Sequence, residues 1–299
     1  STALNTQGAS FYFKGDLAKA IDYYTRSLNI REELGNKIGI AMSLGNIGVI
    51  YEKQGNYANA IEYYARSLKI REETGDKKGI ASTLNNIGNI YHRQGNYKKA
   101  MYYFSRSLKI REEIGNKKDI AQSLNNIGNI YDDQGDYAKA LDYHTKSLKI
   151  KEEIVDKRGI AISLNNIGAI YSDQGDYAKA IDYYTRSLKI SVEIGSKNGI
   201  AYSLNNIGNI YYEQGDYDKA LEKSTEALGI AQEIGVVKRI EHASNNLWKI
   251  NKKLGKHRQA LEMHELYIQM RDSILSIENK EAIIHQGFKY EYEKEQALA

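Results

Sequence analysis

The sequence of 299 residues contains no cysteine and no proline. Without cysteine, the chain has no disulfide bonds, thiolate nucleophiles or cysteine metal ligands. Without proline, it lacks the residue that most strongly interrupts helices. No apolar run approaches the length that spans a membrane and no signal peptide is recognisable, so we expect no membrane insertion within this fragment. The chain begins with Ser1 rather than methionine, and we therefore expect an excised fragment or a processed product.

Several functional motifs are also missing. The net charge is +4, and Lys/Arg and Asp/Glu are mixed along the chain without a dense basic tract, so we expect no nucleic-acid partner. The six histidines do not have the spacing of a metal motif, and the glycines form neither a phosphate loop nor a nucleophile elbow. We therefore expect no catalytic residue, no metal site and no cofactor.

What the sequence does contain is a repeat of forty residues. Alanine recurs in one column, at Ala20, Ala60, Ala100, Ala140, Ala180, Ala220 and Ala260. Glycine recurs in another, at Gly15, Gly55, Gly95, Gly135, Gly175, Gly215 and Gly255. A period of this length is typical of stacked repeat proteins. The sequences of the first and last units differ most from the others, as those of capping repeats do. Seven units fit without an insertion: 1–40, 41–80, 81–120, 121–160, 161–200, 201–240 and 241–280.

Each unit predicts two helices. In 121–160, the first helix runs through AQSLNNIGNIYDDQ and ends at Gly135, a residue suited to a left-handed C-cap. Asp136 is then the expected N-cap of a second helix, YAKALDYHTKSLKIKEE. The forty-residue unit is therefore a helical hairpin that stacks on its neighbours.

The repeat resembles a known family. The residues at the spacing of the tetratricopeptide signature are Leu124, Ile127, Gly128, Tyr131, Gly135, Tyr137, Ala140, His144, Ser147 and Leu148. The signature proline is missing, and a longer second helix explains forty residues in place of thirty-four. The long repeats resemble those of the spindle-orientation adaptor with GoLoco motifs, and the LNN run resembles kinesin light chain. The linker G-[DN]-K-x-G-I-A and the ending RDSILSIENKEAIIHQGFKYEYEKEQ resemble the repeat regions of bacterial sensor histidine kinases and related cyclases.

The resemblance implies an all-α, right-handed superhelix of seven hairpins over 1–280, followed by a C-terminal helix at 281–299. We expect residues 271–299 to be mainly helical, because Ile274, Ile277, Ile284 and Phe288 recur near helical spacing. Two interpretations of this ending remain open. It caps the apolar end of the solenoid, or it connects to an effector domain or a dimer partner.

The resemblance also implies that the first helix of each hairpin lines a concave groove. Groove places in each unit are the second, fifth, sixth, ninth, twelfth and thirteenth. Asparagines fill the fifth, sixth and ninth places at Asn85, Asn86, Asn89, Asn125, Asn126, Asn129, Asn165, Asn166, Asn205, Asn206 and Asn209. A carboxamide both donates and accepts hydrogen bonds, so this ladder suits the backbone of an extended peptide. We expect groove exposure at the fifth and ninth places, whereas the sixth place fits either a ligand or a bond between helices.

Other groove places suggest which ligand is favoured. Tyr202 and Tyr212 are candidates for stacking on a ligand. Acidic residues occupy the twelfth and thirteenth places at Asp132, Asp133, Asp173 and Glu213, which favours a partner segment with basic residues over 130–175. The cations that clamp a free C-terminus in some relatives are absent from the second, fifth and sixth places, so a C-terminal carboxylate is not expected.

The sequence therefore predicts a non-enzymatic scaffold for a protein or extended peptide, as the sensory or interaction region of a larger signalling protein. The alternative is a structural or oligomerising spacer without a groove ligand. The default expectation for localisation is the cytoplasm, or the periplasm if the chain is part of a membrane sensor.

Overall fold

The computed structural model describes residues 1–276, and these are helical apart from short connections. The all-α fold class predicted above is confirmed. The helices are α1 (Thr2–Phe13), α2 (Leu17–Glu33), α3 (Lys37–Lys53), α4 (Tyr57–Thr74), α5 (Lys77–Arg93), α6 (Tyr97–Ile114), α7 (Lys117–Asp133), α8 (Tyr137–Glu153), α9 (Lys157–Asp173), α10 (Tyr177–Glu193), α11 (Lys197–Glu213), α12 (Tyr217–Glu233) and α13 (Val237–Lys253). A further helix covers 257–276. The predicted helix at 281–299, with Ile284 and Phe288, and Ile277 before it lie outside the described residues.

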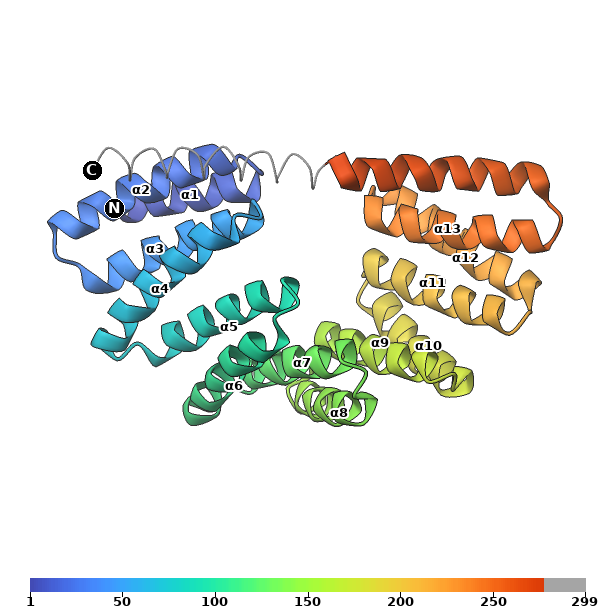
Figure 1. Cartoon of the computed structure of the whole chain (residues 1–299), viewed down its shortest axis with the longest axis horizontal. Helices are drawn as coiled ribbons and strands as arrows, with labels where there is room; N and C mark the ends of the chain where they lie inside the picture. Colours follow the sequence, from blue (N-terminus) through green and yellow to red (C-terminus); the bar gives the residue numbers. More distant parts are fainter. Residues whose placement is uncertain (277–299) are drawn as a thin grey trace. The chain divides into compact units, whose positions relative to one another are not determined.

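The chain divides into two compact units, Ser1–Ile130 and Tyr131–Glu278, called unit 1 and unit 2 below. In unit 1, α1 packs on α2, α3 on α4 and α5 on α6 (Figure 1). In unit 2, α9 packs on α10 and α11 on α12. Odd-numbered helices of successive hairpins also touch: α3 contacts α5 in unit 1, and α11 contacts both α9 and α13 in unit 2. We call the surface made by these first helices the odd-helix face of each unit.

Side-chain caps explain where the helices begin and end. Asp136 is the N-cap of α8, where its Oδ1 accepts a hydrogen bond from the Lys139 backbone N–H at 3.2 Å. Gly135 before it has φ +75°, the left-handed conformation that glycine adopts at little cost. Both predictions for this turn are confirmed. Among residues 1–276, Val155 is the one non-glycine residue with positive φ, at +56°.

Close packing within a hairpin depends on glycine in the first helix. A Cβ on Gly48 would lie 2.7 Å from the Tyr64 ring, and one on Gly88 would lie 2.6 Å from the Phe104 ring. Only a residue without a side chain admits the aromatic ring at this crossing. In the last hairpin, a large residue, Trp248, takes the place of the glycine, and His264 takes the place of the aromatic ring. The two rings are in contact, with centroids 4.3 Å apart.

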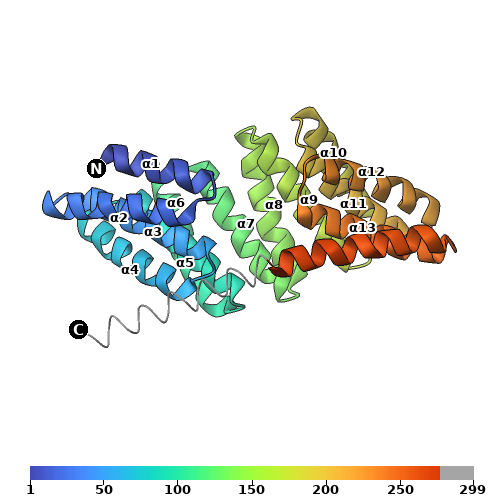
Figure 2. The ribbon, with the colours of Figure 1, turned by 90° about the horizontal axis from the view of Figure 1, so that it is seen from above.

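The helix over 257–276 completes the core of unit 2. Met263, Leu266 and Met270 pack against the buried cluster that contains Leu247, and Figure 2 shows this helix beside α13. The residues after 270 continue as helix to 276, which is the described part of the helix predicted over 271–299, and Ile274 is partly buried. Whether the ending caps the solenoid or connects to another domain stays a prediction.

Candidate functional site

Successive first helices are in a fixed register in which residue i faces residue i+41. In unit 1, Asn126 donates from Nδ2 to Asn85 Oδ1 at 3.0 Å. In unit 2, Asn246 donates in the same way to Asn205 Oδ1 at 3.0 Å. The sixth-place asparagine of one hairpin therefore bonds the fifth-place asparagine of the hairpin before it. The asparagine columns join neighbouring hairpins within each unit.

Burial corrects one expectation about these columns. Asn85, Asn165 and Asn205 are only 4%, 6% and 8% exposed, so the expected groove exposure at the fifth place is wrong for them. The reason is lateral packing, because this face of the helix turns toward the next first helix and its amide is used there. Asn165, for example, accepts a hydrogen bond from Ser203 Oγ at 3.0 Å.

The other predicted asparagines are partly buried. These are Asn86, Asn89, Asn125, Asn126, Asn129, Asn166, Asn206 and Asn209. Asn86 faces Gly45 in this register, and Gly45 has no side chain to accept its hydrogen bond. Asn86 hydrogen-bonds the Tyr64 side chain instead. A ligand-binding role for any member of the columns stays a prediction.

The i/i+41 register brings complementary groups together at the ends of the unit 1 helices. Lys53 Nζ lies 4.7 Å from the centre of the Tyr12 ring, a cation–π arrangement. Arg93 lies 3.8 Å from the Glu52 carboxylate, and Glu52 also accepts a hydrogen bond from the Tyr64 hydroxyl at 2.8 Å. Each charged group here has a partner of suitable chemistry.

The same register brings two carboxylates together in unit 2. Burial, with repulsion from Asp173 and Asp133, raises the pKa of Asp132 to about 6. Burial also raises the pKa of Asp173. Asp132 Oδ1 is buried without a hydrogen-bond partner among the described residues. The predicted acidic residues Asp132 and Asp173 are therefore brought together. Asp132 is partly buried, whereas Asp133, Asp173 and Glu213 are exposed.

The predicted aromatic residue Tyr202 lies in a hollow of about 270 Å³ with Asn165 and Asn166. Two arginines that sequence analysis missed, Arg158 and Arg239, also line it. Arg239 stacks 4.3 Å from the centre of the Tyr202 ring. The other predicted tyrosine, Tyr212, does not line this hollow and contacts Tyr217, with ring centroids 5.7 Å apart. The missed signal was in the repeat itself, because four other first helices have glycine in their first turn at the place of Arg239.

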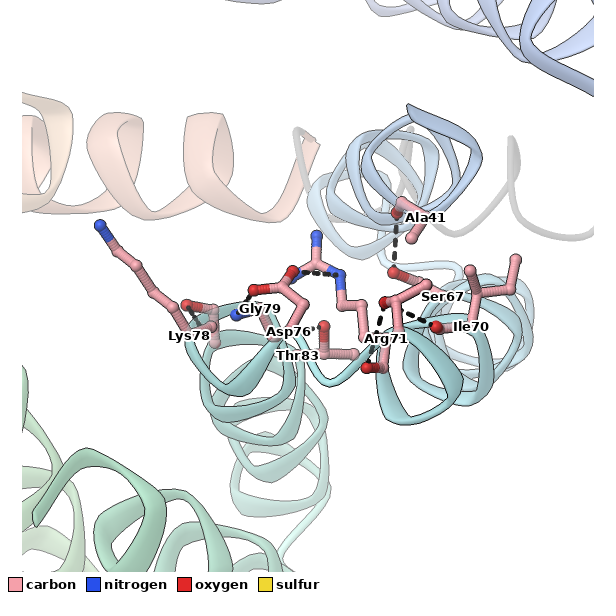
Figure 3. A network of polar contacts seen from close by, with 10 residues as sticks. Ala41, Ser67, Ile70, Arg71, Asp76, Lys78, Gly79 and Thr83 are labelled. Atoms are coloured by element: carbon pink, nitrogen blue, oxygen red, sulfur yellow. Dashed lines mark hydrogen bonds and ion pairs between the residues drawn. The ribbon is translucent and has the colours of Figure 1, made fainter. Parts of the chain in front are cut away.

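A column of cations, three of them buried and Arg71 partly buried, lies behind the odd-helix face. Arg31 donates from Nη1 to the Gly39 carbonyl and to Ser43 Oγ, both at 2.8 Å. Arg71 occupies the same place in the next hairpin, beside Asp76 with Nε and Oδ2 4.0 Å apart (Figure 3). Lys151 continues the column in unit 2 and donates to Ser163 Oγ at 2.8 Å, and burial lowers its pKa to about 8. We call this set, Arg31, Arg71, Arg111 and Lys151, the cation column.

The described residues form neither a metal cluster nor a membrane-spanning helix. Within residues 1–276, no three His, Cys, Asp or Glu side chains converge in a way that could hold a metal ion. In the same part of the chain, no helix combines the length and the hydropathy needed to cross a membrane. His144 is fully buried, and both of its ring nitrogens lack a hydrogen-bond partner there. Burial lowers the pKa of this histidine to about 4, which suits a packing role.

A family model described as "Tetratricopeptide repeat" matches residues 1–73, 79–153 and 159–233. The chain belongs to the tetratricopeptide repeat family. The resemblance inferred from the signature residues is thereby confirmed, and tetratricopeptide repeats typically serve as scaffolds for protein interactions. No curated protein matches the sequence.

Solved structures share the fold of this tetratricopeptide chain at low sequence identity. The apo form of RapI matches with a TM-score of 0.74 and 20% identity, over 92% of this chain and 98% of its own. BtubC from P. vanneervenii matches with a TM-score of 0.65 and 20% identity, over 74% of this chain and 92% of its own. A signal transduction ATPase with a tetratricopeptide repeat sensor, from Pyrococcus horikoshii, matches with a TM-score of 0.74 and 18% identity, over 92% of this chain and 43% of its own.

Proposed function

We propose that this tetratricopeptide chain is a non-enzymatic scaffold whose odd-helix face in unit 2 binds an extended protein segment through a basic side chain. The observation that carries the proposal is the pair of carboxylates Asp132 and Asp173. Complementary groups occupy this register in unit 1, whereas here two acids repel each other. A lysine or arginine from a partner would supply the missing positive charge.

The energetic argument rests on the state of Asp132. A partly buried carboxylate with an unpartnered oxygen is destabilised relative to one that is solvated or paired. A charge-assisted hydrogen bond from a bound cation relieves both the missing contact and the repulsion between the two acids. The free energy stored in this repulsion therefore becomes part of the binding free energy, and a preformed site of this kind favours a cation over a neutral side chain.

Relatives in fold support a peptide or protein ligand. A Rap protein solved in complex with competence and sporulation factor has a TM-score of 0.67 to this chain at 17% identity. The Pyrococcus protein uses its tetratricopeptide repeats as a sensor within a longer chain. By analogy in fold, the present chain is the sensory or interaction region of a larger signalling protein.

The test is selection of a random twelve-residue phage-displayed peptide library on the purified chain. We expect lysine or arginine to be enriched at one position of the selected peptides, and the enrichment to disappear on Asp132→Asn/Asp173→Asn. The matched control is Asp142→Asn/Asp182→Asn, which removes two exposed carboxylates that pair with Lys146 and Arg186 on even-numbered helices. This control should select the same peptides as the wild type.

The pH dependence gives a second readout. Because the pKa of Asp132 is about 6, protonation below that pH removes the negative charge, so a selected peptide should bind more weakly at pH 5 than at pH 7.5. Added salt should weaken it as well, because exposed charges are screened beyond about 8 Å at physiological ionic strength. If no peptide is enriched, or if the enriched peptides bind the Asp132→Asn/Asp173→Asn variant equally well, the proposed function is wrong and a spacer role is favoured.

A further inference from the structure

The hollow in unit 2 has a structural origin in one substitution within the repeat. It lies between α9, α11 and the first turn of α13, and we call it the α9–α11 hollow. Its volume is about 270 Å³, and the residues of its lining that matter here are Arg158, Ile162, Asn166, Ser191, Tyr202 and Arg239.

Ser191 takes the place that the cation column fills in earlier hairpins. Arg111 and Lys151 each reach across to the next hairpin and donate to a serine hydroxyl, Ser123 and Ser163, at 2.8 Å. The short side chain of Ser191 cannot span this distance. The space of a long side chain is therefore left empty, and its lining loses those contacts.

Ser203, the serine equivalent to Ser123 and Ser163, hydrogen-bonds other groups. Ser203 donates to Asn165 Oδ1 at 3.0 Å and lies 3.3 Å from Ser187 Oγ. The floor of the hollow is thus satisfied without a cation. The hollow consequently does not call for a replacement lysine or arginine, and its ligand must be sought from the charge on its rim.

The charged side chains that line the α9–α11 hollow are positive. Arg158 and Arg239 are the charged residues of the lining, and neither forms an ion pair among residues 1–276. Arg239 is fixed in place, because its Nε donates to Asn198 Oδ1 at 3.0 Å and its guanidinium stacks on Tyr202. Four further N–H groups of a guanidinium remain for an incoming acceptor. Burial lowers the pKa of Arg239, which reflects the cost of a cation without a counter-charge.

We propose that the α9–α11 hollow binds an acidic side chain, aspartate or glutamate, of the partner segment. Arg239 offers its planar edge to both carboxylate oxygens, a geometry that arginine matches better than lysine. Arg158 contributes the second positive charge. Ile162, which is 47% exposed, and Tyr202 provide apolar surface for the methylene groups of the ligand. This inference rests on the proposed function, because it assigns a second contact of the same bound segment.

The geometry of α9 sets the spacing between the two contacts. Arg158 is near the start of the helix and Asp173 is its last residue, so a rise of about 1.5 Å per residue separates their backbones by about 22 Å. An extended segment advances about 3.3 Å per residue. The acidic and basic residues of a partner that lies along α9 should therefore be about six or seven positions apart.

The same twelve-residue phage library tests this inference when it is selected on the wild type, Arg239→Gln and Ser191→Arg. We expect wild-type selections to combine an acidic position with a basic one six or seven residues away. Arg239→Gln should lose the acidic preference and retain the basic one. Ser191→Arg should do the same, because it refills the hollow with the side chain that Arg31 and Arg111 use. The control Arg186→Gln removes an exposed arginine of α10 that pairs with Asp182, and it should change neither preference.

Affinity measurements on one selected peptide complete the test. Replacing its acidic residue with the matching amide should weaken binding to the wild type at least tenfold and have little effect on binding to Arg239→Gln. If selections show the basic preference alone, or if the amide peptide loses equally on both proteins, the inference is overturned and the proposed function stands. If neither preference appears, both are overturned. If Arg239→Gln unfolds, the result from Ser191→Arg decides.

Discussion

Unit 1 and unit 2 are built from the same repeat, yet they differ in the groups that the i/i+41 register brings together across neighbouring hairpins. In unit 1, Lys53 covers Tyr12 and Arg93 faces Glu52. In unit 2, the same register brings Asp132 toward Asp173. The comparison teaches that in a chain of nearly identical repeats, binding capacity is best sought where one repeat departs from the rest.

The cation column shows the same contrast. Arg31 and Arg111 are 5% exposed and each makes two hydrogen bonds in unit 1. In unit 2, Lys151 donates a hydrogen bond to Ser163, and Ser191 ends the column. The side chain at this position therefore stabilises the packing of hairpins in unit 1, whereas in unit 2 the short Ser191 leaves room for a ligand.

The largest effect is expected from breaking the column in unit 1. Arg111→Ala would leave the Ser123 hydroxyl and the Asp119 carbonyl without their donor and open a cavity. We expect a loss of about 4 kcal/mol in the free energy of unfolding. Ser191→Ala in unit 2 removes no comparable contact and should cost less than about 1 kcal/mol. Guanidinium titration of both variants measures the difference, and equal losses would contradict the comparison.

The second effect is acid sensitivity confined to unit 2. The folded pKa of His144 is about 4, below the ordinary value of about 6.5. Between these values the unfolded chain binds more protons than the folded one, so the free energy of unfolding falls as the pH drops from 6.5 to 4. Converting this difference in pKa predicts a loss of up to about 3 kcal/mol. The raised pKa of Asp132 acts in the opposite direction over a similar range, so wild type must be compared with a matched variant.

His144→Phe is that variant, because Phe104 fills the equivalent place in unit 1 and is fully buried. It should unfold with a flatter pH dependence than wild type between pH 6.5 and 4, and this difference isolates His144 from all other titrating groups. Urea titrations at several pH values provide the measurement. Parallel curves for the two proteins would show that His144 does not titrate differently on unfolding.

The third prediction separates the two kinds of asparagine. Asn205 accepts a hydrogen bond from the buried Asn246, so Asn205→Ala leaves that amide short of a partner and should cost about 2 kcal/mol. Asn209 is partly exposed on the same helix, and alanine is the better helix former, so Asn209→Ala should stabilise by about 0.5 kcal/mol. Chemical denaturation is sufficient for both. A cost of more than about 1 kcal/mol for Asn209→Ala would make the ninth place structural as well.

The sequence was sufficient to predict the hairpins because their signals are local. Asp136 and Gly135 mark a cap and a turn within a few residues of each other, and both act as predicted. The exposure of Asn85, Asn165 and Asn205 was wrongly predicted because it depends on a helix about forty residues away. The α9–α11 hollow was missed for the same reason. It needs Ser191 from one helix and Arg239 from another, and neither residue is unusual when its own helix is considered alone.

The smallest difference concerns one turn of unit 2, which departs from its counterparts in both units. The connection after the second helix has glycine with positive φ at Gly35, Gly195 and Gly235, whereas Val155 adopts φ +56° in unit 2. A β-branched residue in this conformation is strained by about 1–2 kcal/mol. Val155 is 69% exposed, so removing its side chain forfeits little burial.

Val155→Gly should therefore stabilise unit 2, and the gain should be about 1 kcal/mol after the extra freedom that glycine has in the unfolded chain is subtracted. Val155→Asn is the matched control, because asparagine tolerates the left-handed conformation without the full freedom of glycine, and it should stabilise as well. Thermal and guanidinium unfolding measure both gains. If either substitution destabilised the protein, the valine would be making a contact that outweighs its backbone strain, and the turn after α8 would differ from its counterparts in more than one residue.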